Sequence, residues 1–518
     1  MIRLFSDFKN NKKSSDRLIS ILILVIVISI RLLTSSSHNV YHSHDTGNVA
    51  FAVQDYNLDK ERPHLPGYFL HVMIIRSINM FTNDTHTSMI FLSALYSALG
   101  VMLGYLIMRK FSGISQSVII ASILATNPFV WFYGSLTEIY SFDLFFSAFI
   151  IYLSFDKKHI YLTPVIFAIG AGVRQTSVII LLPFYIRTFY KFYKEDRNVK
   201  RIIVANLIGA IALLMWFIPF LLSVGGLSHY INLYKTQNPV PDIGLLKNSV
   251  QMLIYFFWII FPVIIFVITS RREGKLWERK IIEICLYILI PSFLVFTFVH
   301  YTRGYWLIAT IPVMMIIAMY KFDLRFKLTA GIVILLQLLY FFFFPYKVDS
   351  LDQFYTTSMR KSSDISVILS RLNNQNSVAY SYIRAIDGYQ TDIEKVTGEL
   401  KADNQFNNDV VFIDPTVPIQ SNALHAGLSN YHFSSLDLKN KNLNFIYEGL
   451  VQNKYSNREA MLSNCLGVSL LQFEKIIKDK VQIIFRTNSL IFWKTRADSS
   501  FALNSIYIQY FQKQQEKK

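Results

Sequence analysis

Long apolar runs alternate with short polar segments over residues 18–344, whereas the rest of the chain is mostly polar. The runs are about 17–22 residues long, and about 20 apolar residues in a helix span the hydrocarbon core of a bilayer. The pattern therefore predicts a polytopic α-helical membrane protein with about 11 spans. The spans are expected at about residues 18–33, 88–108, 116–132, 139–155, 202–224, 249–269, 281–299, 306–320 and 328–344, with two further short spans within 159–189.

One apolar segment near the N-terminus is too short to cross a bilayer. Gly67–Phe81 follows Pro66 and contains His71 and Arg76. We therefore expect a helix that lies in the interface, within a first outer loop of residues 34–87.

The segment 159–189 has basic residues at both ends, which poses a problem of topology. A single span would place the basic stretch that starts at Arg187 on the outer side. Two short spans, broken at Gly170–Ser177, keep it inside. Glycine and polar residues are tolerated at membrane depth where they line a cavity, so we expect the broken pair.

The distribution of charge fixes the expected orientation. The net charge is +17, but Lys and Arg gather in the short segments between spans, with 23 in the predicted inner segments and 7 in the predicted outer ones. This is the positive-inside pattern of membrane proteins, so nucleic acid is not the expected partner. We expect residues 1–17 to be a cytoplasmic tail and residues 18–34 to be a span, not a cleaved signal. The protein should lie in the plasma (inner) membrane, with the C-terminal part outside.

Residues 345–511 form a separate polar segment, which we interpret as a small extracytoplasmic α/β or α+β domain. Expected strands are 377–382, 409–413, 444–447 and a hairpin of 481–485 with 490–493, whereas 457–480 is expected to form one or two helices. Residues 512–518 should be a disordered tail. Cys285 lies in an apolar span and Cys465 lies near the C-terminus, so no disulfide framework is predicted.

The polar stretch with the most chemistry lies in the first outer loop. It contains His42-Ser-His-Asp-Thr-Gly-Asn48, followed by Arg62-Pro-His-Leu-Pro-Gly-Tyr68. Asp45 follows a span closely and is placed to act as a general base at the membrane surface. Arg62 and His64 could contact a phosphate. The alternatives are a solvated loop acid for Asp45 and interfacial anchoring for the second motif.

Further candidates precede or interrupt the later spans. Glu138 could contact sugar hydroxyls or complement a helix dipole. Asp143 lies inside an apolar span, where it could be functional or pair with an arginine. Arg174 and Gln175 lie at the expected break, where Arg174 would line a wet cavity, contact a lipid phosphate or pair with an acid.

His300, Arg303 and Tyr305 form a polar cluster between two long spans, and the guanidinium could grip a phosphate. The alternative is a polar turn with interfacial aromatic residues. Arg31, near the outer end of the first span, is expected to snorkel to the interface, or else to face the site. His42, His44 and His64 lack metal-site spacing, so no metal and no cofactor are expected.

These motifs resemble those of GT-C glycosyltransferases, the superfamily that includes the protein O-mannosyltransferases. His44-Asp-Thr-Gly47 and His64-Leu-Pro-Gly-Tyr68 are similar to the Asp-Ser-Gly and His-Pro-Pro-Gly-Tyr patterns of that superfamily, with Thr46, Asn48 and Leu65 as departures. Thr137-Glu-Ile-Tyr140 and residues 300–312 are also similar. The resemblance covers about residues 18–320.

The resemblance implies a sugar donor linked to polyprenyl phosphate and a catalytic aspartate in the first outer loop, here Asp45. We therefore expect an inverting membrane glycosyltransferase that moves the sugar to an extracytoplasmic glycan, lipid or protein. The alternatives are a transporter or flippase of lipid-linked sugars and a non-catalytic glycan-binding membrane protein.

Overall fold

The computed structural model describes the helical part of the chain at residues 12–36, 44–60, 62–237, 245–274, 278–298 and 303–344. In the C-terminal part it describes residues 379–381, 383–384, 395, 410–413, 432–437, 442–447, 450–455, 461–462, 466–470, 474, 478–479, 481–487, 490–495 and 501–502.

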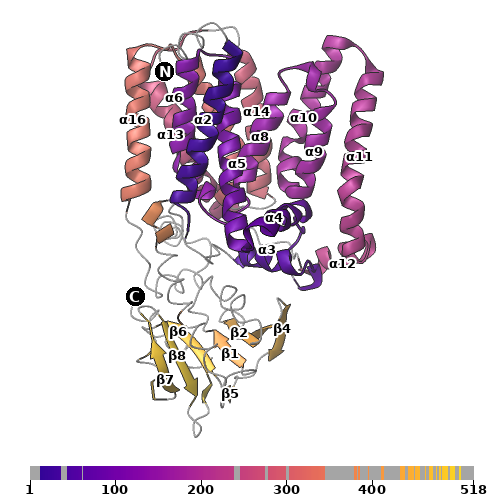
Figure 1. The fold of residues 1–518 in the computed structure, drawn as a ribbon, viewed down its shortest axis with the longest axis vertical. Coiled ribbons are helices and arrows are strands. Elements are labelled where there is room, and N and C mark those ends of the chain that lie inside the picture. Colours follow the sequence, from indigo (N-terminus) through magenta and orange to yellow (C-terminus); the bar gives the residue numbers. More distant parts are fainter. Residues whose placement is uncertain are drawn as a thin grey trace.

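Helices make up almost all of the described chain up to residue 344. They are α2 (Lys12–Leu33), α3 (His44–Gln54), α4 (Phe69–Thr82), α5 (Thr85–Met108), α6 (Ile114–Thr126), α7 (Pro128–Gly134), α8 (Ser141–Leu153), α9 (Leu162–Val173), α10 (Gln175–Asp196), α11 (Val199–Ser223), α12 (Leu227–Gln237), α13 (Leu245–Thr269), α14 (Glu278–Phe298), α15 (Leu307–Met315) and α16 (Leu324–Phe343). The 3-10 turns are η1 (Leu58–Lys60), η2 (Lys157–His159), η3 (Arg303–Trp306) and η4 (Ile316–Met319). The long helices run roughly parallel to one another, and α3, α4 and α12 lie across one end, called here the α3–α4 end (Figure 1).

The lengths and hydropathies of the helices are those of a polytopic membrane protein. Within the described residues, α5, α11, α14 and α16 are each long and apolar enough to cross a bilayer, and the bent pair α6–α7 makes a fifth. The helices α4, α8 and α9, residues 255–269 of α13, and α15 together with η4 are apolar but shorter. Each apolar segment predicted as a span coincides with a helix or, for 116–132 and 306–320, with two consecutive helical pieces.

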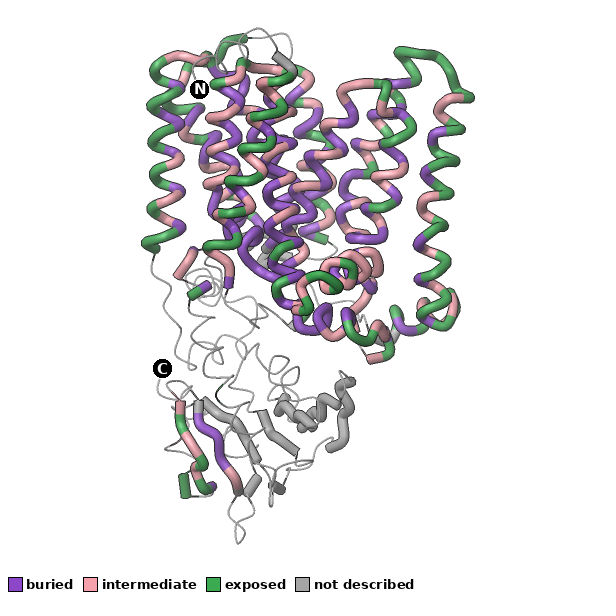
Figure 2. The backbone as a smooth tube through the Cα atoms, viewed as in Figure 1, coloured by how far each residue is buried: buried purple, intermediate pink, exposed green. Residues whose placement is uncertain are grey.

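Apolar side chains cover the outer faces of the bundle as well as its core. On α11, Leu207, Ile211 and Met215 are all more than half exposed. Figure 2 shows exposed residues interspersed with buried ones along α16, at the opposite edge. A surface of this kind would be unfavourable in water, whereas lipid tails solvate it.

The expected break in the segment 159–189 is confirmed. The helix α9 ends at Val173 and α10 begins at Gln175, with Arg174 in an extended conformation between them. The segment expected to form an interfacial helix is helical, as α4, and its position in the membrane interface stays a prediction. The segment 116–132 is not one straight helix, because α6 and α7 meet at a bend of 62°. Asn127 accepts hydrogen bonds from two backbone N–H groups of α7, and Pro128 starts that helix, so the chain begins a new helix there.

The interpretation of Arg31 as a snorkelling side chain is wrong, because the side chain is buried inside the bundle; the alternative that it faces the site stays a prediction. The side chain is 1% exposed, donates to Ser97 Oγ (3.2 Å) and the Ala125 carbonyl (2.6 Å), and lies over the Trp131 ring. These three partners are supplied by α5, α6 and α7, which the sequence alone could not bring together.

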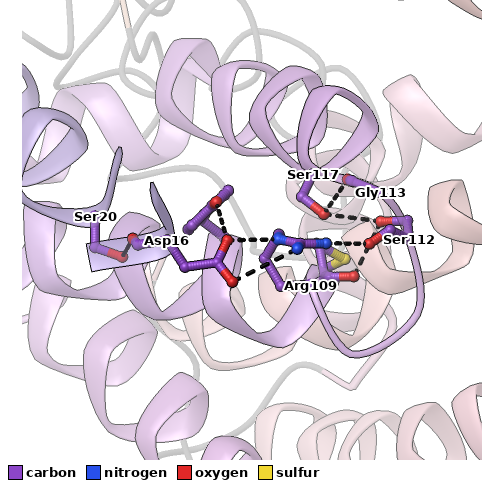
Figure 3. Close-up of polar contacts among 8 residues, drawn as sticks. Asp16, Ser20, Arg109, Ser112, Gly113 and Ser117 are labelled. Atoms are coloured by element: carbon purple, nitrogen blue, oxygen red, sulfur yellow. Dashed lines mark hydrogen bonds and ion pairs between the residues drawn. The ribbon is translucent and has the colours of Figure 1, made fainter. Parts of the chain in front are cut away.

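At the end opposite α3 and α4, a polar cluster ties α2 to α5 (Figure 3). Asp16 Oδ1 accepts from Arg109 Nε (2.7 Å) and from the Tyr105 hydroxyl (2.8 Å). Arg109 also donates to the Ser112 carbonyl at 2.6 Å. The guanidinium is thus held on both sides, which fixes the start of α2 against the turn between α5 and α6.

The C-terminal part contains a mixed sheet in the order β4-β3-β2-β1-β6-β8-β7, with β5 and β9 as a separate pair. The strands are β1 (Val410–Ile413), β2 (His432–Asp437), β3 (Asn442–Tyr447), β4 (Leu450–Tyr455), β5 (Met461–Leu462), β6 (Leu466–Leu470), β7 (Val481–Arg486), β8 (Leu490–Thr495) and β9 (Phe501–Ala502). The strand β1 pairs in parallel with β2 and β6, and the other pairs are antiparallel.

Several predictions for this part can be compared with the described residues. The strands around 409–413 and 444–447 and the hairpin of β7 with β8 are confirmed. The predicted strand at 377–382 is wrong where it is described, since residues 380–381 are helical. The helical prediction for 457–480 is wrong over β5 and β6, because Leu466–Leu470 pairs with strands on both sides and this pairing outweighs the local pattern. The tail 512–518 lies outside the described residues.

Candidate active site

Asp45 lies at the start of a helix, not in an irregular loop as the sequence suggested. It occupies the first turn of α3, where a negative charge complements the helix dipole. The next three residues, Thr46 to Asn48, are buried, whereas the side chain of Asp45 is 55% exposed. The carboxylate is therefore anchored by a packed helix and remains open to an incoming group.

The structure brings the two motifs of the first outer loop together. Asp45 Oδ1 lies 3.8 Å from His64 Nδ1, and the His64 ring packs edge-on against Tyr68 with ring centroids 5.1 Å apart. An acid and an imidazole that approach this closely share a surface that could meet a substrate. The prediction that both motifs belong to one site agrees with this geometry.

The bend that carries His64 is fixed by residues from distant parts of the chain. The Tyr56 hydroxyl donates to the Gly67 carbonyl (2.8 Å), and the Tyr230 hydroxyl of α12 donates to the Pro66 carbonyl (3.3 Å). Gly67 has a φ of 103°, which L side chains rarely adopt. A Cβ there would lie 2.8 Å from Tyr56 Oη. Glycine at this position therefore allows both the turn and the contact.

Two contacts that the sequence did not reveal hold α3 and its loop in place. Arg76 of α4 donates to the carbonyls of Ala52 and Val53, both at 2.8 Å, and so satisfies the last turn of α3. The His229 ring of α12 lies 2.9 Å from Asp59. A basic residue one helix later, and a histidine far along the chain, gave no local signal of these roles.

Arg62 is engaged by an acid of its own loop. Its Nη1 lies 3.1 Å from Asp55 Oδ2, and its guanidinium lies over the Phe51 ring. Lys60 also approaches Asp55, at 3.7 Å. This arrangement places Arg62 beside the loop that carries His64, with its positive charge already partly balanced.

A buried ion pair occupies the break between α9 and α10. Arg174 Nε lies 3.3 Å from Asp143 Oδ2, and both side chains are 3% exposed. The Ser177 hydroxyl donates to the same carboxylate, and the guanidinium stacks on the Tyr140 ring at 4.4 Å. The expectation that Asp143 pairs with an arginine thus agrees with the geometry, and the arginine is Arg174.

His71 adjoins this ion pair from α4, which packs on the end of α9. The side chain is 4% exposed. Burial, together with the positive charge of Arg174, lowers the pKa of His71 to about 3. The imidazole is therefore neutral at physiological pH. Sequence reasoning noted His71 only as a polar residue of an interfacial helix.

Glu138 and the turn η3 complete the polar groups at this end. Glu138 is buried, and its backbone carbonyl accepts from the Ser93 hydroxyl at 2.8 Å. Gly304 lies against Tyr140, since a Cβ at Gly304 would overlap the tyrosine ring. Tyr140 thus contacts both Arg174 and the backbone of η3. His300, and the side chains of Arg303 and Tyr305, lie outside the described residues.

The described contacts form two neighbouring groups of predicted site residues. One joins Asp45 to His64, and the other joins Arg174 to Asp143, Tyr140 and the turn that contains residue 303. Neither of these groups of described residues includes a contact between Asp45 and Arg174. Nor do the described His, Cys, Asp and Glu residues include a group of three that could hold a metal ion. Because His42 and His300 lie outside them, a metal-free site stays a prediction.

Comparisons with known proteins give the family and the fold that this chain resembles. Residues 50–199 match the family model for the N-terminal domain of protein O-mannosyl-transferase TMEM260. The structure is similar to that of ArnT from Cupriavidus metallidurans bound to undecaprenyl phosphate, with a TM-score of 0.52 and 10% identity over 92% of this chain and 98% of that chain. The apo form of the same ArnT gives a TM-score of 0.47 at the same identity and coverage. No curated protein sequence matches the chain significantly. The resemblance to GT-C glycosyltransferases is confirmed: residues 50–199 are similar to an O-mannosyl-transferase domain, and the chain has a fold similar to that of ArnT.

Proposed function

We propose that this protein is an inverting membrane glycosyltransferase that moves a sugar from a polyprenyl-phosphate donor to an extracytoplasmic glycan, lipid or protein. The observation that carries the proposal is the approach of Asp45 to His64 at the α3–α4 end of a GT-C-like bundle. The family match of residues 50–199, and the undecaprenyl phosphate bound to the similar ArnT structure, support the class of donor.

Asp45 acts as the general base in this proposal. As the acceptor hydroxyl attacks the anomeric carbon, its proton passes to the carboxylate, and the bond from that carbon to the phosphate oxygen breaks. The displaced polyprenyl phosphate keeps the electron pair of that bond. The half-exposed position of the carboxylate suits this role, because an acceptor can reach it from outside the bundle.

Cations near the site stabilise the negative charge that develops on the leaving phosphate. We assign this role to Arg303, with His64 as a hydrogen-bond donor and with His300 and Tyr305, close to Arg303 in the sequence, as further contacts. Arg62 is a weaker candidate, because Asp55 already offsets its charge. Glu138 would contact the sugar from the start of α8.

The membrane topology belongs to the same proposal. Eleven crossings with the N-terminus inside place α3, α4 and the C-terminal sheet on the outer side, where a lipid-linked donor and an extracytoplasmic acceptor meet. Single cysteines at Ser35 and Ser112, labelled with an impermeant maleimide in intact cells, test this orientation. Only the first should react.

The decisive experiment for the function is Asp45→Asn, assayed in membranes with a polyprenyl-phosphate-linked sugar as donor. The control is Asp156→Asn, which makes the same change in an exposed aspartate next to η2, at the far end of α8. The first variant should lose at least a hundredfold in turnover, as expected for removal of a general base, and the second should keep normal turnover. Full turnover in Asp45→Asn would remove Asp45 from the mechanism.

A transporter of lipid-linked sugars is the second candidate, and the broken pair α9–α10 favours it, since many transporters build their sites from interrupted helices. Transporter sites lie near the bilayer midplane, however, and this break lies beside α4 at one end of the bundle. Transfer of a fluorescent lipid-linked sugar across vesicles that contain the purified protein, without glycosyl transfer, would favour this alternative. A catalytically inactive glycan-binding protein would show neither activity.

A further inference from the structure

The break between α9 and α10 contains buried polar atoms that the ion pair does not satisfy. Among the described residues, neither His71 Nδ1 nor Gln175 Oε1 has a hydrogen-bond partner, although both atoms are inaccessible to solvent. A buried polar atom without a partner costs about 1–3 kcal/mol, so proteins rarely leave such atoms unfilled. Two of them beside one charged pair indicate a place that something else fills.

The contacts around the break place these two atoms in one neighbourhood. Gln175 directly follows Arg174, and the positive charge of Arg174 acts on His71. Leu70, which precedes His71, packs on Gly172, where a Cβ would lie 2.6 Å from the leucine side chain. The beginning of α4 therefore lies against the end of α9, and His71 adjoins the break.

The chemistry of the group favours a neutral ligand over a phosphate. The charge of Arg174 is balanced by Asp143 at 3.3 Å, so an anion entering here would meet a carboxylate as well as a guanidinium. Neutral His71 adds no charge. The Gln175 oxygen can only accept a hydrogen bond, and an ionised phosphodiester has no proton to give. A hydroxyl group can both donate and accept, so it fits both atoms.

We propose that His71 and Gln175 form a subsite at the α9–α10 break that binds hydroxyl groups of the donor's sugar. This inference rests on the proposed function, because it assumes a lipid-linked sugar as donor. It assigns Arg174 the role of positioning residue: paired with Asp143 and stacked on Tyr140, it holds Gln175 at the start of α10. The phosphate is then left to the cations of the first outer loop and of residues 300–305.

The test compares the binding of two lipids to the full-length protein purified in detergent. One probe is mannosyl-phospho-undecaprenol and the other is undecaprenyl methyl phosphate, which has the same charge and no sugar. The wild type should bind the mannosyl lipid more tightly. His71→Phe and Gln175→Met should each weaken that binding by about three- to tenfold, the range for a neutral hydrogen bond, and leave the binding of the methyl phosphodiester unchanged.

The unchanged binding of the methyl phosphodiester also reports that each variant is folded. A matched control is Gln337→Met, which makes the same change at a buried glutamine of α16 that accepts from Thr126 at 2.8 Å. This variant should bind both lipids as the wild type does. A further check uses monodeoxy mannosyl lipids: the analogue that lacks the bound hydroxyl should lose affinity for the wild type and lose nothing more in His71→Phe.

The outcomes that overturn the inference are distinct from those that overturn the function. Equal weakening for both lipids would assign His71 and Gln175 to the phosphate or to the fold. Unchanged affinity in both variants would mean that water fills the site. A wild type that binds both lipids equally and still transfers sugar would leave the function standing and remove the subsite. A wild type that binds neither lipid would remove the proposed donor and the subsite together.

Discussion

The ion pair of Arg174 with Asp143 gives the sharpest test of how the bundle is stabilised. Asp143→Asn keeps the shape of the side chain and removes its charge. The two groups are 3% exposed and 3.3 Å apart, and at an effective dielectric constant of 20 their attraction is about 5 kcal/mol. The variant leaves a buried guanidinium without its counter-charge, for which we expect a loss of about 3–5 kcal/mol in the free energy of unfolding.

The double variant Asp143→Asn with Arg174→Gln separates the attraction between the two charges from the cost of burying them. Removing both charges removes the attraction and also the cost of burying them, so this variant should be more stable than Asp143→Asn alone. The assay is unfolding by denaturant or heat in detergent at neutral pH, followed by tryptophan fluorescence.

A matched control comes from the other aspartate–arginine pair near the site. Asp55 and Arg62 are 3.1 Å apart, but Asp55 is 49% exposed. Asp55→Asn should therefore cost less than about 1 kcal/mol. The reasoning fails if Asp143→Asn is no more destabilising than Asp55→Asn. It also fails if the double variant loses as much stability as the single variants Asp143→Asn and Arg174→Gln lose when added together.

Three further predictions follow from contacts around α3 and α4. Gly67→Ala puts a side chain on a residue with φ 103° and against Tyr56 Oη, so it should lower the free energy of unfolding by about 1–3 kcal/mol and also lower the turnover. The control Gly331→Ala adds a side chain that meets open space on α16. It should be neutral or stabilising by up to about 1 kcal/mol in the same unfolding assay. Arg76→Met removes two hydrogen bonds to the end of α3, so it should reduce turnover clearly. The melting temperature of the whole bundle, measured by calorimetry, should change little. The pKa of His71 is about 3 in the folded protein and 6.5 in the unfolded chain, so between these values the unfolded chain binds more protons. The free energy of unfolding therefore falls as the pH falls through that window, by up to about 1.4 kcal/mol per pH unit. Melting temperatures at pH 7 and pH 5 should differ less in His71→Phe than in the wild type.

The lengths of the apolar runs and the positions of the basic residues made the helical bundle predictable. Apolar runs give the helices, and the basic residues that flank them led to the break at Arg174, because a single span would have placed Arg187 on the wrong side. The bend at Asn127 was missed although its signal was local, an asparagine followed by a proline. The strand Leu466–Leu470 could not be predicted in this way, because its partners lie about 25 and 55 residues away in the chain.

The local motifs of the site were predictable, whereas the contacts between residues of different helices were not. The Asp45 and His64 motifs are local, and their approach required only that one loop fold back on itself. The partners of Arg31, Arg76 and Arg174 come from other helices, and a single sequence does not reveal which residues of two helices face each other. The same limit explains why His71 was overlooked: its importance arises from a neighbour about 100 residues later in the chain.

The two ends of the bundle differ in how their buried polar groups are satisfied, and this difference bears on function. At the end where α2 begins, Asp16, Arg109 and Ser112 bind one another closely. At the α3–α4 end, the described residues include buried polar atoms without a partner in the structure, on Ser36, His71, Thr137, Ser141, Gln175 and Trp306. A structural role alone would favour satisfied groups at both ends, because each unfilled atom is unfavourable. Capacity for hydrogen bonds that is concentrated at one end is what a protein needs if it receives a polar ligand there, and it places that ligand on the side of the bundle that holds Asp45.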